Sequence, residues 1–390
     1  MAQNTIIGQA ARGSDFFPRP QITNEIWEKI ESGSNLLLVA PRRVGKSSIL
    51  FNLLDDPREN RLVIYYTSES VNNENEFYKK LYHHITDKIS GIQKYWAKTQ
   101  SGVKDFLSRV ESVNIKGGVE LGTSKISYLD ELNNLIKKLE IDDDRIIVLV
   151  DEFAQTVENI LQDENEKAAI HFLESNREIR QAPEIYRKLQ FIYAGSIGLE
   201  NIVSRINGIN TINDLASIQI PPLNRKEVDS LINNLLNATG IEFDKGAYDH
   251  LLNKIEWWIP FYFQLILDDI KRILTDTNSK IITQLIINQA IEKALSQRIY
   301  FEQWFTRLRK AFKGNEFSFV KELLNIISIK LTISVVEIVN LSIKYHVESI
   351  YKELLNVLKH DGYINNNDDS KIYRFNSPLL RDWWKNNVAD

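Results

Sequence analysis

The sequence predicts an α/β protein in which a parallel sheet is sandwiched by helices and is followed by a helical lid and a C-terminal winged-helix domain. Two apolar segments, Leu36–Val39 and Ile146–Val150, have the aliphatic composition of strands that are buried on both faces of a parallel sheet. Further strand patterns alternate with helical patterns, which indicates right-handed βαβ units. Helical patterns follow, and the chain ends with a hairpin pattern. We therefore expect domains at residues 1–223, 224–297 and 298–390.

The composition is that of a globular protein with two or three domains, because the chain has 390 residues of which 43% are hydrophobic and 26% are charged. The net charge of -4 gives no bulk attraction to nucleic acid or to anionic lipid. The chain has no cysteine, which excludes disulfides, thiolate catalysis and cysteine-based zinc sites. The N-terminus lacks an apolar core of signal-peptide length and no aliphatic run has the length of a membrane span, so we expect a cytoplasmic protein without a membrane partner.

The first elements of the sheet domain form a strand–loop–helix unit. A helix over Ile22–Ile30 ends at a polar run and leads into the strand Leu36–Val39. The loop that follows reads APRRVGKS and matches the phosphate-binding pattern G-x-x-x-x-G-K-[ST], with Ala40 at the first glycine. A helix from Lys46 to about Leu54 completes the unit. The alternative is an accidental Gly-Lys-Ser run in an ordinary turn.

This loop has the chemistry to bind a nucleotide and its Mg²⁺ ion. Its backbone N–H groups would wrap the phosphates at the positive end of a helix, and Gly45 lets the backbone come close. Lys46 would reach the β- and γ-phosphates, and the Ser47 hydroxyl would bind Mg²⁺. Pro41 fixes φ near a value that suits a tight turn, so that Ala40 is tolerated. The expected nucleotide-binding residues are Ala40, Pro41, Arg42, Arg43, Val44, Gly45, Lys46, Ser47 and Ser48.

Between the loop and the second aliphatic strand, the pattern continues the alternation of strands and helices. The β-branched and aromatic run Arg61–Thr67 predicts a strand. Residues 75–112 have helical spacing, and Val113–Leu121 predicts two short strands that turn at two glycines. Tyr128–Leu139 is helical again.

The second aliphatic strand ends at two carboxylates, Asp151 and Glu152. Open α/β sheets bind ligands at the carboxyl ends of their strands, so these carboxylates belong to the same edge as the loop. Asp151 would hold Mg²⁺ through water, and Glu152 would orient and deprotonate the attacking water. An ordinary acidic pair at a strand end is the alternative. No guanine-reading N-K-x-D run is present, which favours ATP over GTP.

The sheet domain continues with a helix over Glu166–Gln181 and a buried strand over Leu189–Ser196. A parallel sheet would place Ser196 beside the two carboxylates. The short strand Ile218–Leu223, broken by two prolines, marks the boundary of the domain. From Arg225 to about Ser296 the pattern is helical throughout.

The C-terminal segment has the outline of a winged helix, which is three helices and a hairpin. An amphipathic helix at Tyr300–Lys313 precedes it. The expected helices cover 317–329, 333–344, 347–360 and 378–385, and the expected hairpin strands lie at 362–364 and 371–375. Trp383 and Trp384 end an apolar helix and are expected to be core anchors.

The charge of this segment argues against a primary role in reading DNA. Residues 315–390 hold nine Lys and Arg and ten Asp and Glu, a net of minus one, whereas DNA binding normally leaves a basic footprint. A basic run precedes the segment, and a solvated helix face is its alternative interpretation; it consists of Arg307, Arg309, Lys310 and Lys313. We therefore expect a protein contact or an intramolecular regulatory role first, and DNA second.

Several segments together resemble one known family. PRRVGKSS after a strand, VLVDEF at the second strand, YAGS at the third and the helical lid are similar to the archaeal-type ATPases. These belong to the STAND side of the AAA-like P-loop NTPases, with relatives among the origin-recognition ATPases. YRFNSPLLRDWW resembles the end of the winged-helix domain that often follows in that family. The resemblance covers most of the chain and implies a P-loop NTPase fold, ATP and Mg²⁺ as cofactors, and ATPase activity.

The resemblance also implies roles for single residues. Lys46 and Ser47 match the phosphate and Mg²⁺ contacts, and Asp151 and Glu152 match the Walker B pair of the family. Ser196 is similar in position to the sensor-1 residue that reads the γ-phosphate, with a small residue that closes a turn as the alternative.

Two further similarities involve arginines. Phe17 and Arg19 resemble the F-x-G-R box that packs on the nucleotide, but Pro18 replaces the glycine, and a simple helix lead-in is the alternative. Arg177 or Arg180 lies where relatives place an arginine finger, which would act on the γ-phosphate of a neighbouring subunit. A solvated helix face is the alternative for both arginines.

The lid departs from the family pattern. Glu256–Phe261 resembles the G-x-P segment that carries sensor 2, but Trp258 replaces the glycine and no Arg or Lys follows before Lys271. We interpret this segment as lid core without a sensor-2 arginine, and we therefore expect hydrolysis to be slow or switch-like.

These observations give one preferred function and two alternatives. The preferred function is an ATPase switch whose nucleotide state controls a protein partner or a homo-oligomer, and the resemblance suggests signalling or defence against foreign DNA. The first alternative is a DNA-binding ATPase that acts in replication, transposition or DNA remodelling through its winged helix. The second is a nucleotide-binding module without useful turnover.

Overall fold

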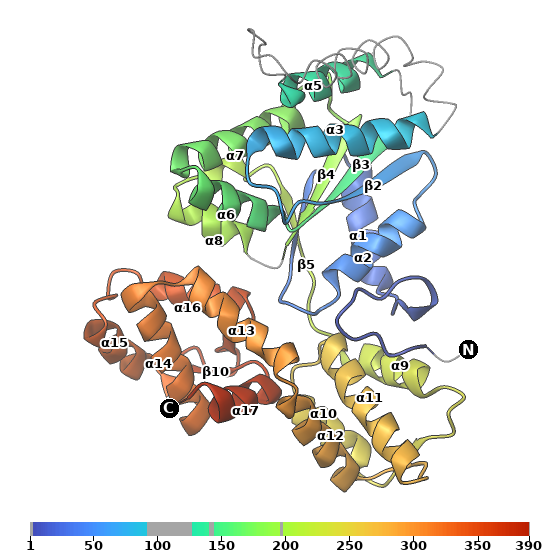
Figure 1. Cartoon of the computed structure of the whole chain (residues 1–390), viewed down its shortest axis with the longest axis vertical. Helices are drawn as coiled ribbons and strands as arrows, with labels where there is room; N and C mark the ends of the chain where they lie inside the picture. The colour runs from blue at the N-terminus through green and yellow to red at the C-terminus, as the bar shows by residue number, and fades with distance from the viewer. Residues whose placement is uncertain (1–2, 92–126, 140–143, 196–197, 390) are drawn as a thin grey trace, which may run out of the picture. The chain divides into compact units, whose positions relative to one another are not determined.

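A computed structural model describes residues 3–91, 127–139, 144–195 and 198–389 of the chain (Figure 1). The chain forms two compact units. The sheet unit consists of Pro18–Val39 and Ile49–Gln219. The helical unit consists of Met1–Phe17, Ala40–Ser48 and Ile220–Asp390, so the predicted phosphate-binding loop is grouped with the C-terminal half of the chain.

The sheet unit contains a five-stranded parallel sheet in the order β2-β3-β4-β1-β5. This confirms the predicted parallel sheet. The strands are β1 Leu36–Val39, β2 Arg61–Thr67, β3 Arg145–Asp151, β4 Leu189–Ala194 and β5 Ala216–Gln219. Both faces of the sheet are buried, because Ile146, Val148 and Val150 of β3 pack in one core while the intervening Ile147 and Leu149 are buried on the other face.

Seven helices surround this sheet in the described part of the unit. They are α1 Pro20–Glu31, α2 Lys46–Asp55, α3 Glu74–Ser90, α5 Tyr128–Lys138, α6 Phe153–Asp163, α7 Glu166–Gln181 and α8 Leu199–Arg205. The sequence pattern did not predict α6, which begins two residues after β3. The two short strands expected at Val113–Leu121, and the end of the helical stretch expected at 75–112, lie outside the described residues.

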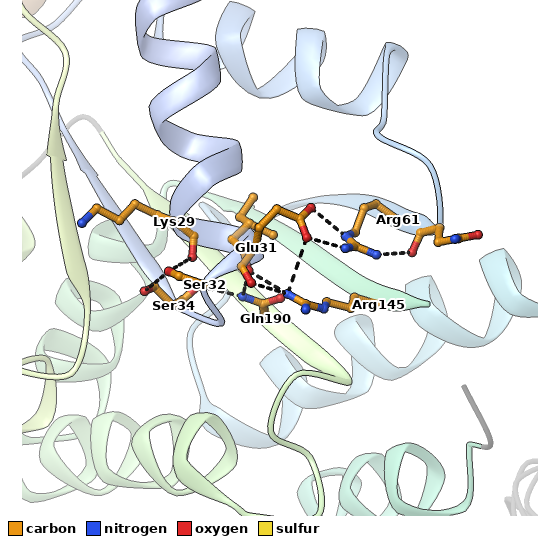
Figure 2. A network of polar contacts seen from close by, with 9 residues as sticks. Lys29, Glu31, Ser32, Ser34, Arg61, Arg145 and Gln190 are labelled. Carbon is orange, nitrogen blue, oxygen red and sulfur yellow. Dashed lines mark hydrogen bonds and ion pairs between the residues drawn. The ribbon is translucent and has the colours of Figure 1, made fainter. Parts of the chain in front are cut away.

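The end of α1 is bonded to the amino ends of β3 and β4 (Figure 2). Gln190 donates its side-chain amide to the carbonyls of Ile30 and Ser34, both at 2.9 Å. Arg145 donates Nη1 to the Ile30 carbonyl, also at 2.9 Å. The last carbonyls of a helix have no intrahelical donor; the Ile30 carbonyl accepts from the Gly33 N–H at 2.9 Å, and these side chains add further donors. They therefore fix the position at which the chain enters β1.

The first part of the helical unit holds four helices and a small strand pair. The helices are α9 Arg225–Leu236, α10 Ala247–Ile255, α11 Pro260–Asp276 and α12 Gln284–Ser296, and the strands are β6 Glu242–Phe243 and β7 Ile281–Ile282, which pair in parallel. The prediction of a purely helical segment is therefore wrong at these two strands. The N-terminal segment is bonded to α11, since Thr5 donates to Asp268 at 3.0 Å and the Ile6 N–H donates to Gln264 at 2.6 Å.

The C-terminal part contains the predicted hairpin. Its elements are α13 Arg298–Ala311, α14 Gly314–Lys330, β8 Ile333–Ser334, α15 Val335–Lys344, α16 Tyr351–His360, β9 Ile364–Asn365, β10 Ile372–Phe375 and α17 Pro378–Asn387. β10 pairs antiparallel with both β8 and β9. Trp383 and Trp384 are buried, and Trp384 donates its indole N–H to Asn325 at 2.9 Å, which confirms that they are core anchors.

Helices that are long and apolar enough to cross a membrane do not occur among the residues that the structure describes.

Candidate functional site

The phosphate-binding loop has the predicted strand–loop–helix context, because β1 ends at Val39 and α2 begins at Lys46. Gly45 has a φ of 102°, in the left-handed region that favours glycine. A Cβ atom built on Gly45 would meet no atom within 4 Å. The loop therefore has open space beside its glycine, which is where a phosphate would approach the backbone.

Lys46 is folded onto the loop itself. Its Nζ donates to the carbonyl of Ala40 at 2.8 Å and to that of Pro41 at 3.1 Å, and the residue is 8% exposed. These bonds close the loop around its own lysine. An ammonium group held this way is positioned inside the loop, where it can exchange carbonyl oxygens for phosphate oxygens.

Asp151 is the last residue of β3, and both of its carboxylate oxygens accept hydrogen bonds. The Tyr65 hydroxyl donates to Oδ2 at 3.0 Å, and the backbone N–H of Glu152 donates to Oδ1 at 3.1 Å. Burial, together with the nearby Asp151 charge, raises the pKa of Tyr65 above its usual value, so the phenol keeps its proton and remains a donor. The carboxylate of Asp151 is therefore held in one orientation.

Glu152 forms the turn between β3 and α6 in a strained backbone conformation. Its φ of 59° is in the left-handed region, which residues other than glycine rarely adopt. The next residue, Phe153, is buried and its ring centroid lies 4.3 Å from that of Tyr193, so the core holds the turn in place. Backbone strain of this kind is concentrated at functional sites, and here it accompanies the carboxylate that the sequence singled out.

Two residues of the acidic strand end were not predicted. Tyr65 binds the Asp151 side chain, and Ser68 binds its backbone, with N and Oγ donating to the Asp151 carbonyl at 3.0 and 3.1 Å. Thr156 of α6 then donates to the Ser68 carbonyl at 2.7 Å. The register of β2 against β3 pairs Thr67 with Asp151. Only this register could have revealed them, since Tyr65 and Ser68 lie 86 and 83 positions from Asp151 in the chain.

The strand order places the ends of three strands at one edge of the sheet. β4 lies between β1 and β3, and Leu38 pairs with Ala194 while Val150 pairs with Tyr193. The carboxyl ends of parallel strands meet at the same edge, and ligands of open α/β sheets bind there. Ser196, the expected sensor, lies two residues beyond β4 and outside the described residues.

Arg180 has neither of the environments that the sequence suggested. It is 5% exposed, which contradicts a solvated helix face. Its Nε and Nη2 bond both carboxylate oxygens of Asp214, at 2.7 and 2.8 Å, and Nη2 also donates to the Thr211 carbonyl at 2.7 Å. Burial opposes the charge, but Tyr193 and Asp214 outweigh it and raise the pKa of Arg180 above its usual value. Arg180 is thus engaged within its own unit, and we do not retain it as an arginine finger.

The other predicted residues lie in three different surroundings. Arg177 is partly buried on α7, and its Nε has no hydrogen-bond partner among the described residues. Arg19 is buried immediately before α1, and its carbonyl accepts from the Thr23 N–H at 3.0 Å, as a helix lead-in would. Phe17 is partly buried at the end of the N-terminal segment of the helical unit.

Comparison with known proteins identifies the fold. Neither a protein-family model nor a curated protein matches the sequence. Among solved structures, the chain resembles the Walker-type ATPase of Pyrococcus abyssi with a TM-score of 0.63 and 17% identity, over 97% of this chain and 99% of that one. It also resembles the ORC2 protein of Aeropyrum pernix in its ADPNP-ADP complexes, with a TM-score of 0.56 and 11% identity, over 94% of this chain and 90% of that one. The chain therefore has the P-loop ATPase fold that these proteins share.

Proposed function

We propose that this chain is a Mg²⁺-dependent ATPase that acts as a molecular switch. The observation that carries the proposal is the combination of a loop closed around Lys46 with an oriented carboxylate at Asp151, which ends a strand of the same parallel sheet that leads into the loop. These two groups are what nucleotide phosphates and their metal ion require. The fold shared with the Walker-type ATPase supports this assignment.

The residues present fit a Mg²⁺ ion bound together with a nucleotide. The Ser47 hydroxyl would be a direct ligand and the Asp151 carboxylate would hold the ion through water, so the site offers oxygen atoms only, which Mg²⁺ prefers. Asp151 is 5% exposed, and its bonds from Tyr65 and the Glu152 N–H fix it as a second shell normally fixes a metal ligand. The bound ion would neutralise charge on the β- and γ-phosphates.

The protein residues then have separate tasks. Lys46 binds the β- and γ-phosphates, and the open space beside Gly45 lets the loop backbone come close to them. Glu152 orients the attacking water and takes its proton. Ser196 remains the proposed γ-phosphate sensor, and Arg177 the proposed finger if copies of the chain associate.

A switch fits this chain better than a fast motor. The lid segment that carries sensor 2 in the resembled family is core here, since Trp257, Ile259 and Phe261 are buried. Without a sensor-2 arginine in this segment, hydrolysis is expected to be slow, and the nucleotide state would persist long enough to control a protein partner or a homo-oligomer. The family resemblance suggests signalling or defence against foreign DNA as the setting.

The order of elements after the lid supports a winged-helix assignment. Helix α14, strand β8, helices α15 and α16, and the β9–β10 hairpin follow in that order. We retain 1–223, 224–297 and 298–390 as the proposed functional domains. In the three-stranded arrangement of β8, β10 and β9, the hairpin turn carries Asp368, which pairs with Arg374 at 2.9 Å. An acidic turn of this kind favours a protein contact over DNA.

ATP turnover of three proteins tests the enzymatic part of the proposal. Glu152→Gln should bind ATP like wild type but hydrolyse it about 10²- to 10⁴-fold more slowly, the usual contribution of a general base. Lys46→Ala should lose ATP binding. Matched controls are Glu174→Gln and Lys167→Ala, two exposed residues of α7, which should behave like wild type. A wild type no faster than Glu152→Gln would refute hydrolysis, and unchanged ATP binding by Lys46→Ala would refute the loop assignment.

One observation favours a second candidate, a DNA-binding ATPase. Arg309, Lys310 and Lys313 are exposed at the end of α13 and just beyond it. Their exposure also agrees with the solvated helix face that the sequence offered as the alternative. A cluster of three cations is a small footprint for DNA.

A further inference from the structure

Three residues of the phosphate-binding loop, Pro41, Arg42 and Arg43, pack on the C-terminal half of the chain, within the helical unit. Arg43 lies over the ring of Phe261, in the first turn of α11, with its guanidinium carbon 3.7 Å from the ring centroid. Arg42 donates Nη1 to the side chain of Gln303 in α13 at 3.1 Å. Both side chains therefore connect the loop to elements that follow it by more than two hundred residues.

Pro41, the preceding loop residue, makes the third such contact. A Cβ atom built on Gly362, in the turn between α16 and β9, would lie 3.2 Å from the Pro41 Cβ and 2.6 Å from Trp257 Cη2. Gly362 also has a φ of 86°, so both its backbone and its surroundings require glycine. Pro41 of the loop, Trp257 of the lid segment and the turn before β9 are thus in close contact at Gly362.

Arg43 adopts a backbone conformation that a glycine would adopt more readily. Its φ is 63°, in the left-handed region, and such strain persists only where the surrounding structure enforces it. A side chain kept at this position against that preference indicates a role for the guanidinium group. The contact with Phe261 supplies part of the compensation, since a cation over an aromatic face is attractive.

The guanidinium of Arg43 is a partly buried cation. Burial lowers its pKa to about 10, and Tyr262 and Tyr300 raise it in part, so the group stays charged at neutral pH. Among the residues that the structure describes, no carboxylate forms an ion pair with Arg43. A cation in this position is attracted by an anion that enters the loop.

We propose that Arg43 is a nucleotide sensor within the phosphate-binding loop, which transmits the nucleotide state to lid helix α11 through Phe261. The inference rests on the proposed function, in which this loop binds ATP. Phosphates bound in the loop attract the guanidinium of Arg43 and change its position over the Phe261 ring. The conformation of α11 changes in response. Arg42 and Pro41 extend the response to α13 and to the turn at Gly362. The loop thereby provides an arginine in place of the sensor-2 arginine that Glu256–Phe261 lacks.

Hydrogen exchange of α11 and α13, measured with and without ATP, tests the coupling. In wild type, ATP should change the exchange of both helices. Arg43→Gly should bind ATP more weakly, because a cation near the phosphates is lost, and at saturating ATP it should still lack the change in α11. Glycine fits the left-handed backbone, so lost folding is not the expected cause. Phe261→Ala touches no nucleotide in this scheme, yet it should change ATP affinity by about 5- to 150-fold, the usual range of coupling between sites.

Two variants separate sensing from a merely structural contact. Phe261→Trp keeps an aromatic face and should restore both the response and the affinity. Arg298→Ala removes an exposed arginine of α13 and should respond like wild type. The inference is overturned if wild type binds ATP without any change in α11, or if Arg43→Gly and Phe261→Ala respond as wild type does. A wild type that does not bind ATP at all refutes the proposed function instead.

Discussion

The environment of a charged residue in this protein depends on a partner far away in the sequence. Arg180 shows this clearly, because the helical pattern of α7 gives no sign of Asp214, which lies 34 residues later and accepts both of its bonds. The sequence predicted either an arginine finger or a solvated helix face at Arg180, and it did not predict the buried ion pair. Tyr65 and Ser68 escaped prediction for the same reason, since their partner Asp151 belongs to the neighbouring strand.

The Arg180–Asp214 pair makes a specific stability prediction. Removal of one partner leaves the other buried and unpaired, so Arg180→Ala and Asp214→Asn should each cost about 3–5 kcal/mol of unfolding free energy. Urea unfolding at neutral pH measures this, with Arg177→Ala on the same helix as the control. A loss below about 1 kcal/mol, the level of a surface pair, would contradict the prediction.

At the scale of elements, long regular patterns were predictable and short ones were not. The bounds expected for β2 and α7 agree with the structure, because β2 is a continuous β-branched and aromatic run and α7 has a sustained period of 3.6 residues. β6 and β7 have two residues each and carry no period, so they were missed. α6 was missed because its start depends on the strained turn at Glu152, which is a feature of three-dimensional packing.

The contacts of Glu31 at the end of α1 predict that the stability of the fold depends on pH (Figure 2). Glu31 accepts from Arg61 Nε at 3.0 Å, and this hydrogen bond holds its pKa below the usual 4.5, with burial opposing and the charges of Arg61, Arg145 and Arg58 assisting. A carboxylate whose folded-state pKa is lowered stabilises the fold above its unfolded pKa. That contribution is lost as the pH falls below 4.5 and through the lower folded value.

Glu31→Gln should therefore destabilise the protein at neutral pH, and the difference from wild type should shrink as the pH falls below about 4.5. The side chain is 35% exposed, so we expect a loss of roughly 0.5–1 kcal/mol at pH 7 after allowance for solvent screening. Urea unfolding across this pH range measures the effect, and Glu28→Gln on the exposed face of α1 is the control. A difference that grows at lower pH would show that the carboxylate does not act in this way.

At the scale of the whole molecule, the sequence located the parts of the candidate site but not their packing. The motif at Ala40–Ser48 predicted a loop between a strand and a helix, and both are present. The structure groups this loop with residues 220–390 through contacts such as Arg42 with Gln303, which are 261 positions apart. No periodicity or motif encodes a contact of that range, so a role for Arg43 beyond phosphate binding could only come from the structure.

The distribution of charge over the chain predicts that any binding to DNA is weak and sensitive to salt. Residues 315–390 carry nine basic and ten acidic side chains, and the exposed basic run before them offers Arg309, Lys310 and Lys313. Three cations that each neutralise one phosphate would give a slope of roughly -3 in log affinity against log salt, and an affinity too weak to persist at physiological salt. An ATPase switch should therefore show no stable DNA complex under those conditions, with or without ATP.

A gel-shift series across salt concentrations, with duplex DNA and with ATP, ADP or neither, measures this. The triple variant Arg309→Ala, Lys310→Ala, Lys313→Ala should retain wild-type ATP turnover and should remove any weak binding seen at low salt. If instead ATP induces a complex that survives physiological salt and shows a much steeper salt slope, more phosphates are contacted than these three residues can reach. In that event a DNA-binding ATPase would be the better assignment for this chain, and ATP hydrolysis at the loop would drive its action on DNA.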